Sequence, residues 1–224
     1  NSQNLARFLE METTIELLKR AFINNKSSLI HVDLEKNEQF KGLEHIKSCL
    51  EAIGNNKVLK FTHTKFNSEL EKTYTISPYL LKEYQNRWYI IGIPEGQKTA
   101  HTYGLDRISD LQISNTSFKR NPDIRPDLNF ESIIGLNYSD NITEKILLKF
   151  TNKQGQYIKT LPLHFSQSTL KEDNDYTWIQ LMIQPNFELK QRILFYTPYV
   201  EIIEPEWLRK EIIQDLQKGL ENYK

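Results

Sequence analysis

Five short runs of β-branched and aromatic residues follow one another between Lys57 and Ile113, with no helical pattern among them. Strands of this length, packed into about sixty residues, predict a small β-barrel. The two-residue connection Gln85-Asn86 predicts a tight hairpin between the second and third runs. Pro78 cannot donate to a ladder and therefore predicts an edge, a bend or a bulge in the second run. The five runs are 58–66, 73–84, 87–93, 99–103 and 108–113.

Two amphipathic helices are predicted before these strands, in a helical segment over 1–56. Apolar residues recur every three or four positions over 8–22, and again over 43–53. The first helix either docks on its own domain or is a connecting or dimerising helix that leads from an upstream segment. Cys49 lies in the second helix, and it is interpreted as a buried structural thiol.

The last third has the pattern of an α+β module with the order βαββαβ and a closing helix. A barrel over 57–118 gives way to a polar, proline-containing linker over 119–142, which includes a short helix at 128–134. Strands and helices then alternate over 143–224, and the order matches a ferredoxin-like arrangement. Asn186 is a candidate helix cap, and Pro205 opens the final helix.

Charge and composition exclude several classes of protein. The 29 basic residues balance 29 acidic residues, which argues against a domain that coats duplex DNA through bulk positive charge. One cysteine excludes an internal disulfide framework and a multi-cysteine zinc site. The longest apolar stretch, Trp88 to Ile93, is too short to cross a bilayer, and we expect no membrane association and a cytoplasmic location.

No pattern of catalytic or metal-binding residues is present in the sequence. Gly96 and Lys98 resemble part of a phosphate loop, but Gln97 interrupts the required Gly-Lys-Ser/Thr order. The five histidines lack the spacing of metal ligands. The sequence therefore predicts a protein that is not an enzyme and that needs no metal or cofactor.

Three segments of the strand region carry a resemblance to a known family. They are Pro78-Tyr79-Leu80-Leu81, Trp88-Tyr89-Ile90 and Leu105-Asp106-Arg107-Ile108. In order and spacing they resemble the WYL-domain family of bacterial transcriptional regulators. The last third resembles the extension that usually follows this domain, through Asn186-Phe187-Glu188-Leu189 and Val200 to Arg209.

The resemblance implies an SH3-like or Sm-like barrel followed by a ferredoxin-like module. It also implies a ligand-sensing regulatory role, with a nucleotide or nucleic acid as the ligand. Relatives usually carry an N-terminal winged helix-turn-helix that binds DNA, and no such fold is visible in this sequence. DNA binding through a domain missing from this chain, and assembly into a homo-oligomer, are expected.

Candidate ligand-binding residues come from the same region. Between Lys57 and Arg107 there are eight basic and five acidic residues, with aromatic residues between them, a pattern that suits stacking on bases and binding of phosphates. Strand alternation places Trp88 and Tyr89 on opposite faces, and Trp88 is assigned to the core. An arginine fork can bind an anion, or it can pair with a neighbouring acid. The predicted site comprises Ser77, Tyr79, Tyr89, His101, Tyr103 and Arg107.

Two other functions remain open from the sequence. The barrel could bind single-stranded nucleic acid directly, in which case binding would weaken steeply with salt. The chain could instead be an oligomerisation module without a ligand, joined through the first helix or the C-terminal module.

Overall fold

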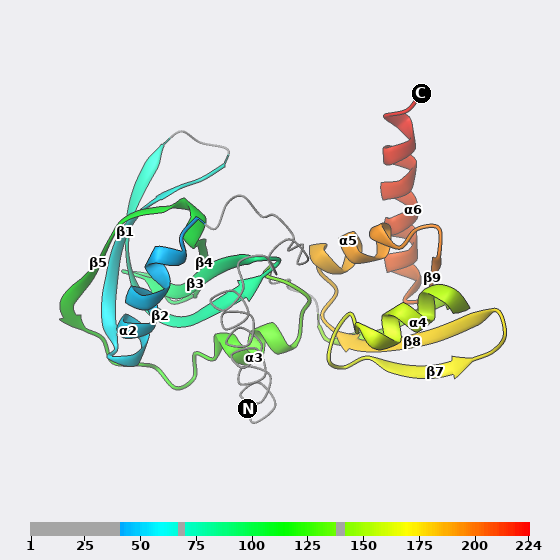
Figure 1. The fold of residues 1–224 in the computed structure, drawn as a ribbon, viewed down its shortest axis with the longest axis horizontal. Coiled ribbons are helices and arrows are strands. Elements are labelled where there is room, and N and C mark those ends of the chain that lie inside the picture. Colours follow the sequence, from blue (N-terminus) through cyan, green and yellow to red (C-terminus); the bar gives the residue numbers. More distant parts are fainter. Residues whose placement is uncertain (1–40, 67–69, 138–141) are drawn as a thin grey trace, which may run out of the picture. The chain divides into compact units, whose positions relative to one another are not determined.

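The computed structural model of the chain describes residues 41–66, 70–137 and 142–224 (Figure 1). These residues form a mixed α+β fold with two antiparallel sheets. The helix predicted over 8–22 lies outside the described residues. No described helix combines the length and the apolar character needed to pass through a membrane.

The first sheet contains five strands in the order β4-β3-β2-β1-β5, and every neighbouring pair is antiparallel. The four-residue β4 pairs with β3, and a short 3-10 helix, η3 (Leu105–Arg107), leads from β4 to β5. No pairing between β4 and β5 closes this sheet among the described residues, so the closed barrel predicted from the sequence is not found. The strands are β1 (Lys57–Thr64), β2 (Glu71–Tyr84), β3 (Arg87–Pro94), β4 (His101–Gly104) and β5 (Ile108–Ser117).

The turn and the irregularity predicted in this sheet are both present. Gln85 and Asn86 have φ angles of 51° and 60°, as a two-residue hairpin with positive φ at both positions requires. The register between β2 and β3 shifts between Pro78 and Leu80, which is a β-bulge. The pairing of β2 with β1 ends at Ile76, so at Pro78 strand β2 is paired only with β3, and the proline lies at both a bulge and a locally unpaired edge.

Helix α2 (Ile46–Gly54) packs on the first sheet, after the 3-10 turn η2 (Leu43–His45). Cys49 and Ala52 of α2 are fully buried in the same core cluster as Leu59 and Ile76. Burial raises the pKa of the Cys49 thiol to about 12. The structure thus places this cysteine where a structural role was predicted.

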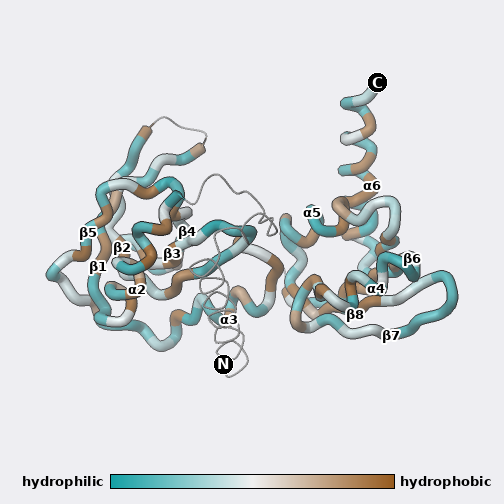
Figure 2. The backbone as a smooth tube through the Cα atoms, viewed as in Figure 1, coloured by the Kyte–Doolittle hydropathy of each residue, from teal (hydrophilic) through white to brown (hydrophobic). Residues whose placement is uncertain are grey.

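The second sheet has the order β7-β8-β6-β9, again with antiparallel neighbours. It follows α3 (Pro126–Glu131), and its elements have the predicted order βαββαβ with a closing helix. Apolar side chains of β6, β8, α4 and α5 contribute to its core, and Figure 2 shows the hydropathy along these elements. Ile146 to Leu148 of β6 are all buried, whereas buried and more exposed positions alternate along β8. The elements are β6 (Glu144–Thr151), α4 (Asn152–Thr160), β7 (Ser168–Glu172), β8 (Tyr176–Ile183), α5 (Phe187–Phe195), β9 (Val200–Glu204) and α6 (Glu206–Glu221).

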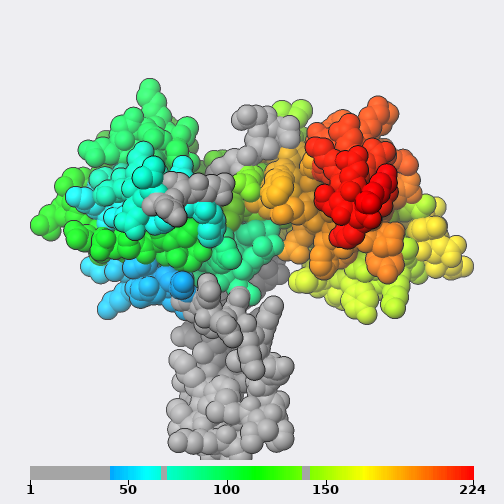
Figure 3. Space-filling view, turned by 90° about the horizontal axis from the view of Figure 1, so that it is seen from above, coloured from blue at the N-terminus to red at the C-terminus, as the bar shows by residue number. Residues whose placement is uncertain are grey.

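The closing helix α6 buries only its first half. Leu208 and Ile212 lie in the core of the second sheet, whereas Leu216 and Leu220 continue the same apolar stripe and are exposed. Figure 3 shows the last turns of α6, in red, at the surface. The amino-terminal half of α6 therefore supplies its buried apolar contacts with this module, whereas the carboxyl-terminal half contributes an ion pair between Asp215 and Lys190 of α5 at 2.9 Å.

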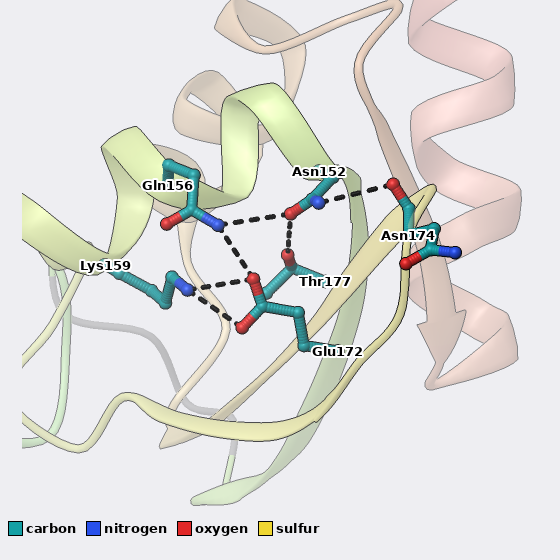
Figure 4. Close-up of polar contacts among 6 residues, drawn as sticks. All are labelled: Asn152, Gln156, Lys159, Glu172, Asn174 and Thr177. Carbon is teal, nitrogen blue, oxygen red and sulfur yellow. Dashed lines mark hydrogen bonds and ion pairs between the residues drawn. The ribbon is translucent and has the colours of Figure 1, made fainter.

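A polar network ties α4 to the β7–β8 hairpin (Figure 4). The Asn152 side chain accepts a hydrogen bond from the Thr177 hydroxyl at 3.2 Å and donates one to the Asn174 carbonyl at 3.3 Å. Lys159 forms an ion pair with Glu172 at 2.8 Å. Because these groups join sequence-distant elements, they fix the helix over the hairpin.

Candidate ligand-binding site

The site begins with the alternation of side chains along β1. Leu59, Phe61 and His63 are buried on one face of the strand, so the imidazole of His63 occupies a position where the pattern would place an apolar group. Only 5% of His63 is exposed. A polar ring at the end of an apolar row needs hydrogen-bond partners.

Aromatic rings surround this imidazole. The His63 ring lies 5.5 Å from the ring of Tyr103 on β4, at an interplanar angle of 82°. The Tyr74 ring of β2 lies 5.0 Å from that of Tyr103, and Phe61 lies 5.2 Å from it. The cluster thus brings β1, β2 and β4 together at one side of the first sheet.

Several polar atoms in this region are buried and have no hydrogen-bond partner among the described residues. They are both ring nitrogens of His63, the hydroxyl of Tyr103, Oδ1 of Asp106 and Nε of Arg107. An unsatisfied buried polar group costs about 1–3 kcal/mol, so native structures seldom collect several in one place. Their concentration makes this region the candidate ligand-binding site.

A pocket of about 470 Å³ opens beside these atoms. His101 is exposed on the pocket wall, and its ring is tilted only 21° from that of Tyr103, at a centroid distance of 6.4 Å. Lys65 adds a positive charge to the wall. The side chains that matter most for ligand chemistry are His63, Lys65, Tyr74, His101, Tyr103 and Asn137.

Arg107, on η3, is not among the residues that line this pocket, but its charge acts on the lining residue His63. Its guanidinium carbon is 4.4 Å from the centre of the Phe66 ring. Its Nε is 3.8 Å from Oδ1 of Asp106, an ion pair that is too long for a hydrogen bond. Gly104 makes this arrangement possible, because a Cβ there would lie 2.5 Å from the same Asp106 oxygen.

The environment favours the neutral forms of both buried polar rings. Burial lowers the pKa of His63, and the charge of Arg107 lowers it further, against an opposing effect of Asp106. Burial raises the pKa of the Tyr103 hydroxyl to about 12, with a contribution from Tyr74. At neutral pH the imidazole therefore offers one donor and one acceptor, and positive charge comes from Lys65 and Arg107.

Two protein-family models match the chain, and together they cover most of it. The WYL domain model matches residues 44–113, and the WCX domain model matches residues 143–220. The chain belongs to the WYL-domain family. The pocket residues from His63 to Tyr103, and Arg107 beside them, all lie inside the matched WYL domain, whereas Asn137 lies between the two domains.

Solved structures show a more distant similarity. The proteasome accessory factor B/C (PafBC) of Arthrobacter aurescens is 14% identical with a TM-score of 0.37, over 78% of this chain and 26% of that one. A CRISPR Cas-related protein is 15% identical with a TM-score of 0.47, over 81% of this chain and 52% of that one. The chain thus spans about a quarter of the first structure and about half of the second. Among curated protein sequences, none gives a significant match.

The WYL domain brings only part of the predicted site together. His101 and Tyr103 line the pocket, whereas Arg107 does not and acts on it only through the effect of its charge on the lining residue His63. Ser77 pairs with Ile93 inside the sheet and is not among the lining residues. The expectation that all six predicted residues share one cavity is therefore corrected.

Tyr79 and Tyr89 point elsewhere for identifiable reasons. The bulge takes Tyr79 out of the regular alternation, and its ring packs 5.7 Å from Phe118 while its hydroxyl accepts a hydrogen bond from the Asn121 amide at 3.1 Å. Tyr89 packs with Ile91 in a separate small core, since alternation puts both on the face opposite to Tyr103. Trp88 packs against the main WYL core, as predicted.

Sequence reasoning missed His63, Tyr74 and Asp106 as parts of the site. The row Leu59, Phe61, His63 contained a signal, because a histidine that continues a buried alternation must have its nitrogens satisfied. No group of three or more potential metal ligands occurs among the described residues.

Proposed function

We propose that this chain is the ligand-sensing, regulatory portion of a bacterial transcriptional regulator, and that its ligand binds in the pocket beside His63 and Tyr103. One observation carries the proposal. Buried polar atoms that have no hydrogen-bond partner within residues 41–66, 70–137 and 142–224 are concentrated in and near this pocket, in the domain that gives the family its name. The proposal implies no catalysis, since the pocket is offered as a place of recognition.

The ligand we propose is anionic, either a nucleotide or a short stretch of nucleic acid. Lys65 and Arg107 supply positive charge for a phosphate. The rings of Tyr74 and His101 offer faces for a base, and the Tyr103 hydroxyl with the His63 imidazole offers hydrogen bonds. Asp106 offsets part of the charge of Arg107, which favours a compact anion over a long polyanion.

The proposal extends to the architecture and to the rest of the regulator. The strand order of the first sheet supports an SH3-like curl over 57–118, and the order β7-β8-β6-β9 supports a ferredoxin-like module over 143–224. A helical segment over 1–56 and a linker over 119–142 complete the proposed domains. Ligand binding in the cytoplasm would control the DNA-binding domain of the regulator, and the coupling requires different ligand affinities in two states.

Binding of a defined panel tests this function. We would titrate the chain with nucleoside mono-, di- and triphosphates and with 5′-phosphorylated oligothymidylates, at about 50 mM and about 200 mM salt. Arg107→Ala is the test variant, and Arg125→Ala is its control, since Arg125 pairs with Asp127 at the surface. We expect Arg107→Ala to weaken binding at least about tenfold, because a charged hydrogen bond contributes about 1.5–3 kcal/mol.

The result also separates the proposal from direct binding of single strands. Binding of a mononucleotide with a shallow salt dependence supports the sensor. Binding only of long oligonucleotides, with a steep salt dependence, supports a nucleic-acid-binding module instead. Absence of binding across the panel, or equal affinity in Arg107→Ala and the wild type, contradicts the proposal that the ligand binds in this pocket.

We also propose a homo-oligomer, on the basis of the apolar stripe that α6 leaves uncovered. Leu216 and Leu220 are exposed, and Tyr223 is 90% exposed. The oligomer is tested by light scattering of the chain and of a Leu216→Lys, Leu220→Lys variant. A monomeric wild type would remove this part of the proposal.

A further inference from the structure

The segment from Ile133 to Asn137 joins the two domains and is called the connector. Its side chains contribute to two different hydrophobic cores. Ile133 packs with Ile91 and Phe130 against the WYL sheet, whereas the next residue, Ile134, lies in the core of the WCX domain. Both side chains are almost completely buried. A shift of this backbone therefore disturbs packing on both sides.

Glu188 of α5 holds the end of this connector. One carboxylate oxygen, Oε1, accepts hydrogen bonds from the backbone amides of Leu136 and Asn137, both at 3.0 Å, and from the Asn137 side chain at 2.7 Å. Glu188 is only 4% exposed, and its Oε2 has no hydrogen-bond partner in the described part of the chain. Gly135 has a φ of 80°, and a Cβ there would lie 2.6 Å from Cγ of Glu188. The carboxylate and the glycine thus fit each other closely.

Asn186 adds a second set of bonds to the same segment. Its side-chain nitrogen donates to the carbonyls of Ile134 at 2.7 Å and Asn137 at 2.9 Å. Its side-chain oxygen caps α5 by accepting from the Leu189 amide at 3.0 Å. The first turn of α5 therefore fixes the connector through both of its polar side chains.

The residues held in this way are also residues of the ligand pocket. Leu136 and Asn137 line the pocket together with His63 and Tyr103. We propose that Glu188 is a positioning residue, which sets the wall of the WYL pocket from within the WCX domain. The inference rests on the proposed function, and it assigns to the WCX domain a share in the affinity of a site that it does not contain.

Coupling of this kind is reciprocal. A ligand that contacts Leu136 and Asn137 stabilises the arrangement in which Glu188 binds them. Loss of the hydrogen bonds from Glu188 therefore lowers the affinity for the ligand by the same factor. Because carboxylate hydrogen bonds are about twice as strong as neutral ones, removal of the charge alone loosens the connector. Glu188→Gln keeps the size of the side chain and is the first test variant.

A second variant and a control make the test independent of folding defects. Asn186→Ser keeps a hydroxyl that can cap α5 but is too short to donate to both carbonyls. Glu206→Gln is the matched control, since the exposed side chains of Glu206 and Lys210 pair with each other at the surface. All variants are made in the full chain, and urea unfolding verifies that each one is folded.

The first measurement needs no ligand. Hydrogen exchange measures the exchange rates of the Leu136 and Asn137 amides, and NMR measures the chemical shifts of the His63 and His101 rings. We expect Glu188→Gln and Asn186→Ser to speed exchange about tenfold and to shift both histidine signals, while Glu206→Gln changes neither. Unchanged histidine signals in both folded test variants overturn the inference, because the pocket would not sense the connector.

The second measurement uses as its probe the nucleoside mono-, di- or triphosphate of the panel that the wild type binds most tightly. We expect both test variants to bind it at least about fivefold more weakly than the wild type and the control. If the wild type binds the probe and the variants bind it equally well, the inference fails and the proposed function stands. If the wild type binds no member of the panel, the proposed function fails, and the ligand-free signals alone decide the positioning role.

Discussion

The imidazole of His63 lies edge to face against the ring of Tyr103, at 5.5 Å, and each side chain buries polar atoms without a partner among the described residues. Such groups lower the stability of the unliganded protein, because they leave water without gaining a hydrogen bond. The same groups raise the affinity for any molecule that satisfies them. Stability and ligand affinity should therefore respond in opposite directions to their removal.

The two buried tyrosine hydroxyls of the WYL domain allow a direct comparison. Tyr103 and Tyr79 are each 4% exposed, but within the described part of the chain only the Tyr79 hydroxyl has a hydrogen bond, from the Asn121 amide. We expect Tyr103→Phe to leave the free energy of unfolding unchanged or to raise it by up to about 1 kcal/mol, and Tyr79→Phe to lower it by about 1 kcal/mol. Urea unfolding followed by tryptophan fluorescence measures both. Equal losses in the two variants would mean that the Tyr103 hydroxyl is already satisfied.

A pH dependence follows from the lowered pKa of His63, which burial and Arg107 produce. The unfolded chain binds the proton more readily than the folded chain, so stability is complete above the ordinary histidine pKa of about 6.5 and is lost as the pH falls below it. The slope is at most about 1.4 kcal/mol per pH unit for each histidine. His164, whose pKa burial also lowers, contributes in the same direction.

The variant His63→Leu isolates one of these contributions. We expect its unfolding midpoint in urea to fall less steeply than that of the wild type between about pH 6.5 and pH 5, because one of the two described histidines with a lowered pKa, His63, is gone and His164 remains. The double variant His63→Leu, His164→Leu should be flatter again. If His63→Leu has the same pH dependence of stability as the wild type, the His63 imidazole of the wild type is as easily protonated in the folded chain as in the unfolded one.

Local chemistry explains which parts of the fold the sequence predicts. Gln85 and Asn86 tolerate positive φ, and Asn186 caps α5, so the hairpin and the helix start appear where these residues stand. The predicted placement of Tyr79 in the pocket differs from the structure because a bulge beside Pro78 changes the register. A shift of one residue moves a side chain to another environment. The bonds from Glu188 to the connector join positions about fifty residues apart, and no short pattern reports them.

The single cysteine offers a probe of the WYL core. Cys49 is fully buried, and burial raises its pKa to about 12, so little thiolate exists at neutral pH. We expect the native chain to react with a thiol reagent only through unfolding or local opening, with a rate that increases with urea. Mass spectrometry after timed alkylation measures the rate, and the urea-unfolded chain is the control. Reaction of the native chain at the unfolded rate would place Cys49 at an accessible surface.

Two helical glycines should respond to alanine with opposite signs. A Cβ on Gly155 of α4 would lie 2.5 Å from Cβ of the buried Thr177 on β8, whereas a Cβ on Gly219 of α6 would have no atom within 4 Å. Alanine stabilises a helix relative to glycine by about 0.5–1 kcal/mol, but overpacking costs about 1–3 kcal/mol. We therefore expect Gly219→Ala to raise the free energy of unfolding by about 0.5 kcal/mol and Gly155→Ala to lower it by about 1–2 kcal/mol.

Urea unfolding of both variants provides the comparison. Because both substitutions have the same effect on the backbone, the difference between them measures how tightly the network around Asn152 and Thr177 holds α4 on β8. A gain of stability in Gly155→Ala would mean that α4 moves away from the sheet without cost, and that the network does not fix its distance.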